Sequence, residues 1–326
     1  MKKALKITGK ILLWLLILIV VFLIIMTIIN QMLLKKDRKD LKDHIGQMVE
    51  IDGSEMCVYT EGEGDHTLVF MSGSGTASPI YDFKTICSRL SDDNRVVVIE
   101  KFGYGFSDIV DGERDFDTIL RQDREALEKL GIEGPFILCP HSMSGLEALM
   151  WAQEYPDEVE AIVGLDMAVP EAYDVINDAS PNSDKLASVI MQAVRECGIF
   201  RLMGDDFLIN RGELTDDEIA VYRKIIYTKA ANDNMLSEGL YTAKACEEIR
   251  SKDMPETPML LFVSDGSGGT GMDTETWRGF TEKFAESIAN ERIVELDCGH
   301  YVHDFEYERI SKDIKEFIKR PDSSAE

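Results

Sequence analysis

The chain alternates short apolar runs with segments in which apolar residues recur every three or four positions. The apolar runs predict strands over 47–52, 55–60, 67–71, 95–99, 136–139, 161–165, 259–263 and 293–296. The periodic segments predict helices over 80–90, 117–130, 145–154, 274–289 and 305–318. Buried strands that alternate with amphipathic helices are typical of a parallel sheet covered on both faces. The pattern therefore predicts an α/β fold.

The alternation stops between residues 168 and 255. This stretch has no strand-like run and carries helical patterns instead, over 185–195 and 216–229. An interruption of about 85 residues is too long for a loop inside a compact domain. We predict a helical cap that is inserted over the carboxyl edge of the sheet.

Residues 11–29 form an apolar run in which Thr27 is the one polar interruption. At about 1.5 Å per residue the run nearly matches the ~30 Å hydrocarbon core of a bilayer. A cleaved signal peptide and a buried core helix are the alternatives. A signal peptide ends in a small-residue cleavage site, which the sequence at 30–35 lacks. We predict a transmembrane anchor over 1–34, a solvated charged linker over 35–46, and a globular domain over 47–326.

Basic residues flank the apolar run in nearly equal numbers on its two sides, so the positive-inside rule gives nearly equal counts for the two orientations. A short basic tail before a long apolar run favours an amino terminus inside the cell and a domain outside it. The sequence therefore favours a single-pass membrane protein with an extracytoplasmic domain, in contact with the lipid bilayer through residues 11–29.

Acidic residues dominate the rest of the chain. The whole chain has 35 Lys and Arg against 60 Asp and Glu, a net charge of −25. The first 42 residues hold nine basic and two acidic residues, so the remainder carries −32. A domain with this net negative charge repels phosphate backbones, so nucleic acid is not an expected partner. The six cysteines are scattered without a C-x-x-C pair, which favours free thiols.

A serine lies in a strand–turn–helix arrangement. The strand 136–139 runs into Pro140-His141-Ser142-Met143-Ser144-Gly145, and a helix follows. A sharp turn of this kind exposes the serine hydroxyl and needs small residues two positions before and after it. Ser144 meets this need and Pro140 does so only loosely. We predict that Ser142 is a nucleophile; the alternative is a serine that caps the helix.

A serine nucleophile needs a base, and the chain has five histidines. His300 directly follows the last predicted strand, which makes it the predicted general base. His303 is interpreted as a helix-start residue. A metal site of Cys298, His300, His303 and Asp304 is an alternative, but this spacing matches no common zinc pattern. We therefore expect neither a metal nor another cofactor.

These motifs resemble the α/β-hydrolase family, in its form with a helical cap, over about residues 47–319. The family order of serine, acid and histidine agrees with Ser142 before His300. The resemblance implies that backbone N–H groups of Ser74, in the loop 71–75, and Met143 form the oxyanion hole. The segment 102–108 resembles the family's Gly-x-Gly-x-Ser turn, interpreted as a supporting turn.

The resemblance leaves two candidates for the acid. In most family members the acid follows the strand after the cap, where this chain has Asp265. In some members, such as haloalkane dehalogenases, it follows the strand before the cap, where this chain has Asp166. Asp273, or no acid at all, is a third possibility. Either aspartate would orient the imidazole and stabilise its cation.

A serine in this turn implies acyl transfer to water through an acyl-enzyme. The expected substrate is a small molecule with an ester, lactone, thioester or small amide or peptide bond, cleaved by a carboxylesterase-like or aminopeptidase-like enzyme. Glu171 is a candidate to bind a substrate amine. The alternatives are a catalytically silent, membrane-tethered binding protein with a hydrolase fold, and an acyltransferase or cofactor-free peroxidase.

Overall fold

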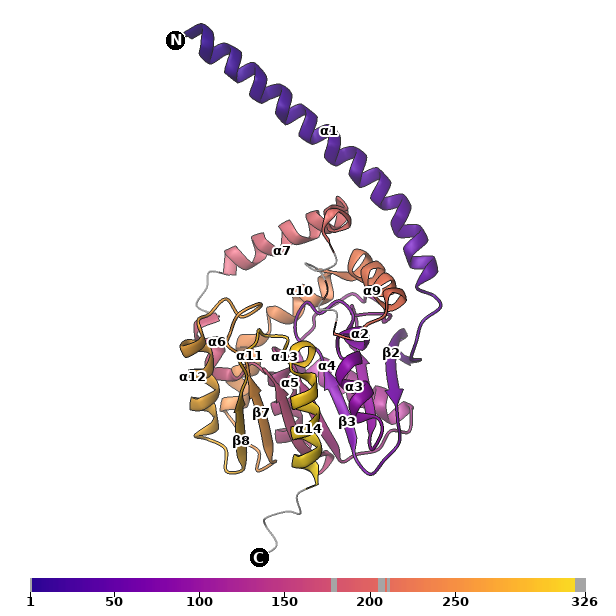
Figure 1. Ribbon diagram of the computed structural model, residues 1–326, viewed down its shortest axis with the longest axis vertical. Helices are drawn as coiled ribbons and strands as arrows, with labels where there is room; N and C mark the ends of the chain where they lie inside the picture. Colours follow the sequence, from indigo (N-terminus) through magenta and orange to yellow (C-terminus); the bar gives the residue numbers. More distant parts are fainter. Residues whose placement is uncertain (1, 177–180, 205–208, 210–211, 320–326) are drawn as a thin grey trace, which may run out of the picture.

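Eight strands form one sheet in the computed structural model, which describes residues 2–176, 181–204, 209 and 212–319 (Figure 1). The strand order is β1-β2-β4-β3-β5-β6-β7-β8. Strand β2 pairs antiparallel with both β1 and β4, and the other five pairings are parallel, so the predicted α/β class is confirmed. The strands are β1 (Gln47–Ile51), β2 (Ser54–Glu61), β3 (Thr67–Met71), β4 (Arg95–Glu100), β5 (Phe136–Pro140), β6 (Val159–Leu165), β7 (Met259–Val263) and β8 (Glu291–Glu295).

Helices cover both faces of this sheet. One face packs against α2 (Pro79–Asp82), α3 (Lys84–Leu90) and α14 (Tyr307–Ile318). The other packs against α4 (Phe116–Lys129), α5 (Ser144–Glu154) and α12 (Thr274–Ala285). The central strands β3 and β5 are buried along their whole length, as two covered faces require. The six cysteines are free thiols, as predicted.

The segment between β6 and β7 is helical, as predicted for the cap. Among its described residues it holds no strand. Residues 177–180, 205–208 and 210–211 of the predicted cap lie outside the described part of the chain. The cap elements are α6 (Pro170–Ile176), α7 (Pro181–Glu196), the 3-10 turn η2 (Ile199–Leu202), α9 (Asp216–Lys229), α10 (Asp233–Gly239) and α11 (Thr242–Arg250).

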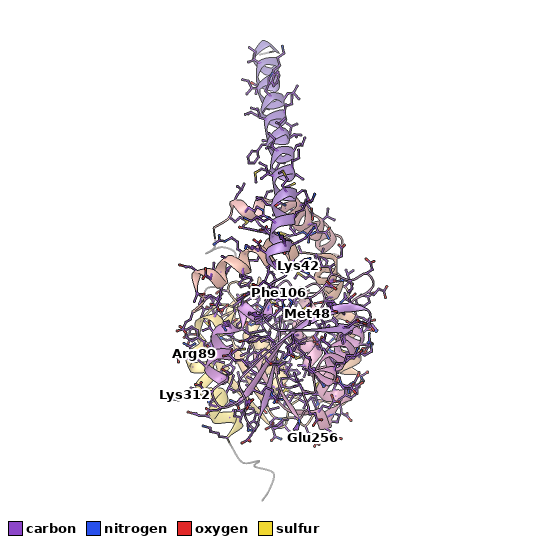
Figure 2. The ribbon with its side chains drawn as sticks, turned by 90° about the vertical axis from the view of Figure 1, so that its right-hand side faces the viewer. Lys42, Met48, Arg89, Phe106, Glu256 and Lys312 are labelled. Atoms are coloured by element: carbon purple, nitrogen blue, oxygen red, sulfur yellow. The ribbon has the colours of Figure 1, made fainter. Side chains whose placement is uncertain are left out.

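Helix α1 (Lys2–Asp40) extends away from the body for most of its length, which Figures 1 and 2 show from two sides. Its apolar side chains, from Ile11 to Ile29, are largely exposed. Among the described residues, this helix is long and apolar enough to cross a membrane. The length and composition of a signal sequence would pass the same test.

The structure differs from the predicted solvated linker at residues 35–40. The helix continues through Asp40, and its last turns pack on the cap. Leu34 is buried there, Asp37 lies 2.6 Å from Arg201 Nη2, and Asp40 lies 2.8 Å from Lys224 Nζ. The charges are therefore partly paired with cap residues, which composition alone did not indicate.

Candidate active site

The turn between β5 and α5 holds Ser142 in a left-handed conformation, with φ +54°. This φ is uncommon for a residue with a side chain and is found where surrounding contacts enforce it. Here two glycines allow close backbone approach. A Cβ on Gly145 would lie 2.4 Å from the Ala168 carbonyl oxygen, and one on Gly73 would lie 2.6 Å from Ser142 Cβ. Ser142 itself is half-buried at the tip of the turn.

His300 lies in the loop that follows β8, at the same carboxyl edge of the sheet. Its Nδ1 is 2.5 Å from Asp166 Oδ2. Its backbone N–H donates to the Ser267 carbonyl at 2.8 Å, and Gly269 packs against the imidazole so closely that a Cβ would lie 2.6 Å from Cδ2. His300 Nε2 makes no hydrogen bond to any described residue. The contact at Nδ1 therefore fixes the ring, whereas Nε2 has no hydrogen-bond partner among the described residues.

Asp166 follows β6 directly and, like Ser142, has a left-handed backbone, with φ +52°. Its carboxylate is buried and accepts three hydrogen bonds besides the contact with His300. The donors are Ser264 N–H at 2.7 Å, Ser264 Oγ at 2.7 Å and Trp277 Nε1 at 2.9 Å. These bonds fix the orientation of the carboxylate behind the imidazole.

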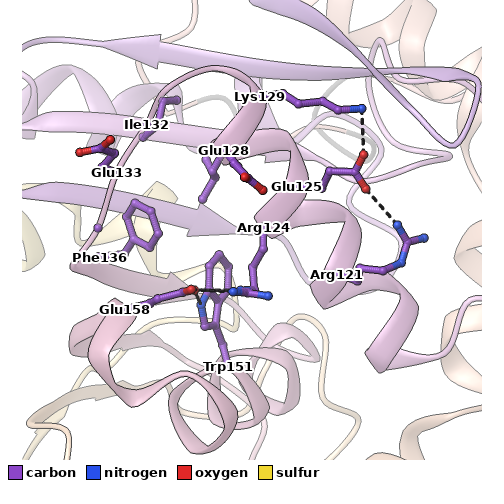
Figure 3. Close-up of a pocket in the computed structure, with 12 residues that line it drawn as sticks. Arg121, Arg124, Glu125, Glu128, Lys129, Ile132, Glu133, Phe136, Trp151 and Glu158 are labelled. Atoms are coloured by element: carbon purple, nitrogen blue, oxygen red, sulfur yellow. Dashed lines mark hydrogen bonds and ion pairs between the residues drawn. The ribbon is translucent and has the colours of Figure 1, made fainter.

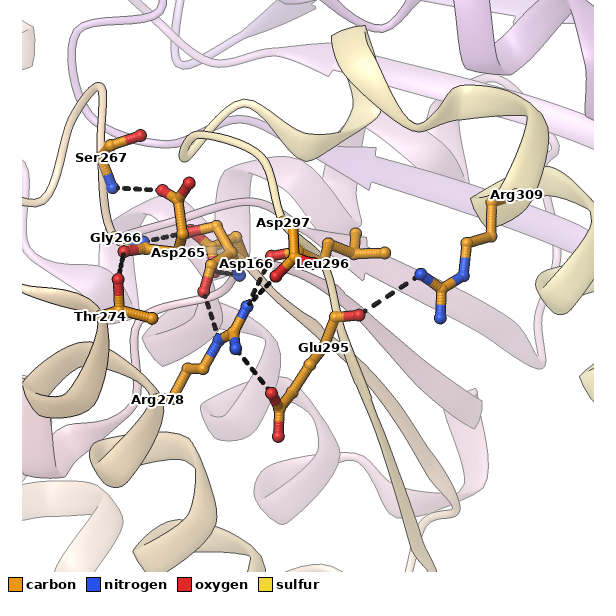
Figure 4. A network of polar contacts seen from close by, with 11 residues as sticks. Asp166, Asp265, Gly266, Ser267, Thr274, Arg278, Glu295, Leu296, Asp297 and Arg309 are labelled. Atoms are coloured by element: carbon orange, nitrogen blue, oxygen red, sulfur yellow. Dashed lines mark hydrogen bonds and ion pairs between the residues drawn. The ribbon is translucent and has the colours of Figure 1, made fainter.

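Asp265, the other candidate acid, makes no contact with His300. Its carboxylate accepts from Ser267 N–H at 2.8 Å (Figure 4), and the Ser267 hydroxyl followed by this N–H lowers the pKa of the carboxyl. Asp265 does not reach His300 because neighbouring side chains of an extended chain point to opposite sides. Because Ser264 is buried against Asp166, Asp265 points the other way. Asp273, the third candidate, accepts from Thr276 N–H and caps α12.

His141 and His303 support the His300 loop from behind. His141 is buried, its ring centroid is 4.6 Å from that of His300, and its Nε2 lies 3.1 Å from the His300 carbonyl oxygen. Burial, and then the neighbouring His300 and His303, hold the pKa of His141 well below its usual value. His141 is therefore uncharged and donates to that carbonyl.

His303 is buried in α13 (Val302–Phe305), and its Nε2 lies 2.8 Å from Asp82 Oδ2. The sequence interpretation as a helix-start residue agrees with its position but missed this partner. Asp82, His303 and Asp304 gather donor atoms within 4.8 Å of one another. Cys298 and His300, which the metal alternative required, do not belong to this group. The described residues thus do not bring the proposed four ligands together.

The two predicted oxyanion donors lie on the loop after β3 and at the start of α5. Within the described part of the chain, neither the Ser74 nor the Met143 N–H donates a hydrogen bond to the protein. Ser74 also lines a cavity of about 500 Å³ between the body and the cap. The body contributes Gly268 and Tyr301, and the cap contributes mostly apolar side chains, among them Met191, Phe200, Ile209, Tyr222, Ile226 and Met235. Of the predicted site residues, Ser74 is among the lining residues, and Ser142, Met143, His300 and Glu171 are not.

A larger hollow of about 930 Å³ lies at the opposite edge of the sheet, beside the first residue of β5 (Figure 3). Its charged side chains are largely paired with one another: Arg124 Nη2 is 2.5 Å from Glu158 Oε1, and Trp151 Nε1 donates to the same carboxylate at 3.0 Å. None of the predicted site residues lines this hollow. Ligands of open α/β sheets bind at the carboxyl ends of the strands, which favours the smaller cavity.

The sheet order, the turn after β5 and the cap before β7 together define an α/β-hydrolase fold. Two of the solved structures with a similar fold are an epoxide hydrolase and an esterase. The epoxide hydrolase of Bacillus megaterium has a TM-score of 0.64 at 16% identity, covering 84% of this chain and all of that one. A thermophilic esterase from Thermogutta terrifontis has a TM-score of 0.62 at 19% identity, covering 84% of this chain and 98% of that one. At these identities the likeness shows the fold alone.

No family model matches the chain. A relative at higher identity is the uncharacterized protein YbdG of Bacillus subtilis. It is 34% identical over 282 residues, which cover 84% of this chain and 86% of YbdG. The chain therefore belongs to the same family as YbdG, within the α/β-hydrolase fold.

Proposed function

We propose that this protein is a serine hydrolase that cleaves an acyl bond through an acyl-enzyme. The observation that carries the proposal is the contact of 2.5 Å between His300 Nδ1 and Asp166 Oδ2, at the sheet edge where Ser142 occupies a strained turn. A silent binding protein has no need for an imidazole oriented by a buried carboxylate. A histidine oriented by a buried aspartate, at the same sheet edge as a serine in a strained turn, is the arrangement that nucleophilic acyl transfer uses.

The proposed reaction begins when Ser142 Oγ attacks the carbonyl carbon and His300 Nε2 accepts the hydroxyl proton. The N–H groups of Ser74 and Met143 stabilise the oxyanion, each donor contributing about 3 kcal/mol in comparable sites. The leaving group takes the proton from His300, and the acyl group stays on Ser142. Water, deprotonated by His300, then releases the acid and restores the serine.

The cavity favours an apolar acyl donor. Its cap side is lined mainly by aliphatic and aromatic side chains, which suits an alkyl or aryl group. An aminopeptidase-like function would need a carboxylate aimed at the substrate amine. Glu171 does not line this cavity, and the carboxylate of Asp82, which does, is paired with His303 Nε2 at 2.8 Å. We therefore favour a carboxylesterase-like activity on an ester, thioester or lactone. We further propose that residues 11–29 of α1 span a bilayer, with the catalytic domain outside the cell.

A panel of p-nitrophenyl esters of increasing chain length tests the proposal on the full chain in detergent. We expect hydrolysis that Ser142→Ala abolishes and that Ser144→Ala, a matched change of a buried neighbour, retains in part. Ser144 Oγ donates to the Met71 carbonyl at 2.6 Å and has a structural role. Hydrolysis at wild-type rate by Ser142→Ala would contradict the proposal.

A further inference from the structure

Helix α1, the proposed anchor, is bound to the cap by hydrogen bonds near its carboxyl end and does not lead directly into a flexible linker. Asn30, at the end of the apolar run, is buried and donates through Nδ2 to the Arg195 and Glu196 carbonyls, both at 3.0 Å. These carbonyls end helix α7. Arg201 donates to Asn30 Oδ1 at 2.6 Å and to Asp37 at 2.6 Å. These hydrogen bonds therefore hold the carboxyl end of α7 against α1 at the point where the apolar run of α1 ends.

The helix held in this way exposes apolar side chains. Val189, Ile190 and Met191 of α7 are 55%, 52% and 42% exposed, and Leu202 of η2 is 61% exposed. These four residues are called the α7 patch below. Both views show that α7 lies on the side of the body from which α1 rises, with the sheet on the far side (Figures 1 and 2). Exposed apolar clusters of this kind mark contact surfaces.

The patch is connected to the candidate site through one of its own residues. Met191 is part of the α7 patch and also lines the cavity that reaches Ser74 and Tyr301. Because Met191 is 42% exposed, the lining of the cavity reaches the protein surface at α7, the cap helix that contacts α1.

Resting on the proposed serine hydrolase and its membrane anchor, we propose that the α7 patch contacts the bilayer surface and that the substrate is a long-chain lipidic ester, which enters the cavity from the membrane. Helix α7, which carries three residues of the patch, is held at its carboxyl end against Asn30, directly after the apolar run of α1. The exposed Lys35, Lys36, Arg38 and Lys39 follow this point on α1, where they suit anionic headgroups. Contact with the bilayer would bury the apolar side chains that the protein leaves exposed.

The test uses the full chain in vesicles of phosphatidylcholine and phosphatidylglycerol. Two substrates are compared: p-nitrophenyl palmitate in the bilayer and p-nitrophenyl butyrate in water. We expect Ile190→Glu to lower palmitate turnover at least 10-fold and to change butyrate turnover less than 2-fold. Ile109→Glu is the matched control, because Ile109 is 48% exposed on a body loop; it should change neither rate more than 2-fold. An unchanged palmitate-to-butyrate ratio in Ile190→Glu would overturn the inference.

A second readout does not require catalysis and so separates this inference from the proposed function. Ile190→Cys and Ile109→Cys are made in a background of Cys197→Ser and Cys298→Ser, which removes the two cysteines that are not buried. A nitrobenzoxadiazole label is attached to each. With nitroxide lipids in the vesicles we expect strong quenching at position 190 and little at 109. Equal quenching at both positions overturns membrane contact, whereas absent hydrolysis of both esters with strong quenching at 190 refutes only the serine hydrolase.

Discussion

Replacing Asp166 by asparagine removes one charge and keeps the side-chain shape, so it isolates the role of the carboxylate. The Oδ1 atom accepts from Ser264 N–H and Trp277 Nε1, at 2.7 and 2.9 Å, and an amide oxygen can keep both bonds. The new amide nitrogen then takes the place of Oδ2, 2.5 Å from His300 Nδ1. Two donors cannot face each other, so His300 must carry its proton on Nε2.

An imidazole protonated on Nε2 cannot accept the proton of Ser142. The same exchange in a comparable triad lowers kcat about 10⁴-fold, which corresponds to about 5 kcal/mol of transition-state stabilisation. Because both Oδ1 contacts survive, we expect the folded structure and KM to change little. The expected outcome is a fall of about 10³- to 10⁴-fold in kcat for Asp166→Asn.

The assay is steady-state hydrolysis of a p-nitrophenyl ester by the wild type, Asp166→Asn and Asp265→Asn. Asp265 is the matched control, since it follows the neighbouring strand and lies away from the imidazole. We expect Asp265→Asn to stay within about 3-fold of the wild type, because its carboxylate contacts Ser267 and not His300. Similar losses in both variants, or a larger loss in Asp265→Asn, would refute this reasoning.

Three further predictions concern the surroundings of the site. Trp277→Phe removes one of the donors to Asp166; we expect about a 10-fold lower kcat at unchanged KM in the ester assay, since a hydrogen bond to a charged group is worth about 1.5–3 kcal/mol. Gly145→Ala would bring its Cβ to 2.4 Å from a backbone oxygen, and urea unfolding should show a loss of about 1–3 kcal/mol. Burial raises the pKa of Glu100 to about 7, so the folded protein binds more protons than the unfolded chain between about pH 4.5 and 7. Stability from this group therefore falls as pH rises, and Glu100→Gln should gain about 3 kcal/mol relative to the wild type between pH 5 and 8; equal pH dependence in both would contradict it.

The strands and the sharp turn at Ser142 were predictable because each depends on neighbouring residues. An unbroken apolar run such as 95–99 has few alternatives to a buried strand, and the structure has β4 there. The turn at Ser142 similarly needs small residues two positions before and after the serine; Ser144 meets this need and Pro140 does so only loosely. Local patterns of this kind can be recognised in the sequence because they involve only residues that are close along the chain.

The partner of His300 and the contacts of α1 with the cap depend on residues that meet only after folding. Asp166 and Asp265 both follow a strand, and no pattern around either reveals that Trp277, from a later helix, donates to the first. The docking of α1 likewise joins Asn30 to carbonyls that are 165 and 166 residues away. Nothing in the sequence around Asn30 indicates these distant partners. The charged residues that follow it therefore predicted a solvated linker.

Covalent labelling of Ser142 tests the central claim most directly. The full chain in detergent is treated with a fluorophosphonate, and the modified peptide is mapped by mass spectrometry. The account predicts one phosphonylated residue, Ser142, with labelling lost in Ser142→Ala and strongly slowed in His300→Gln. A wild-type chain that stays unlabelled, or that is labelled at another residue while Ser142 is unmodified, would contradict it.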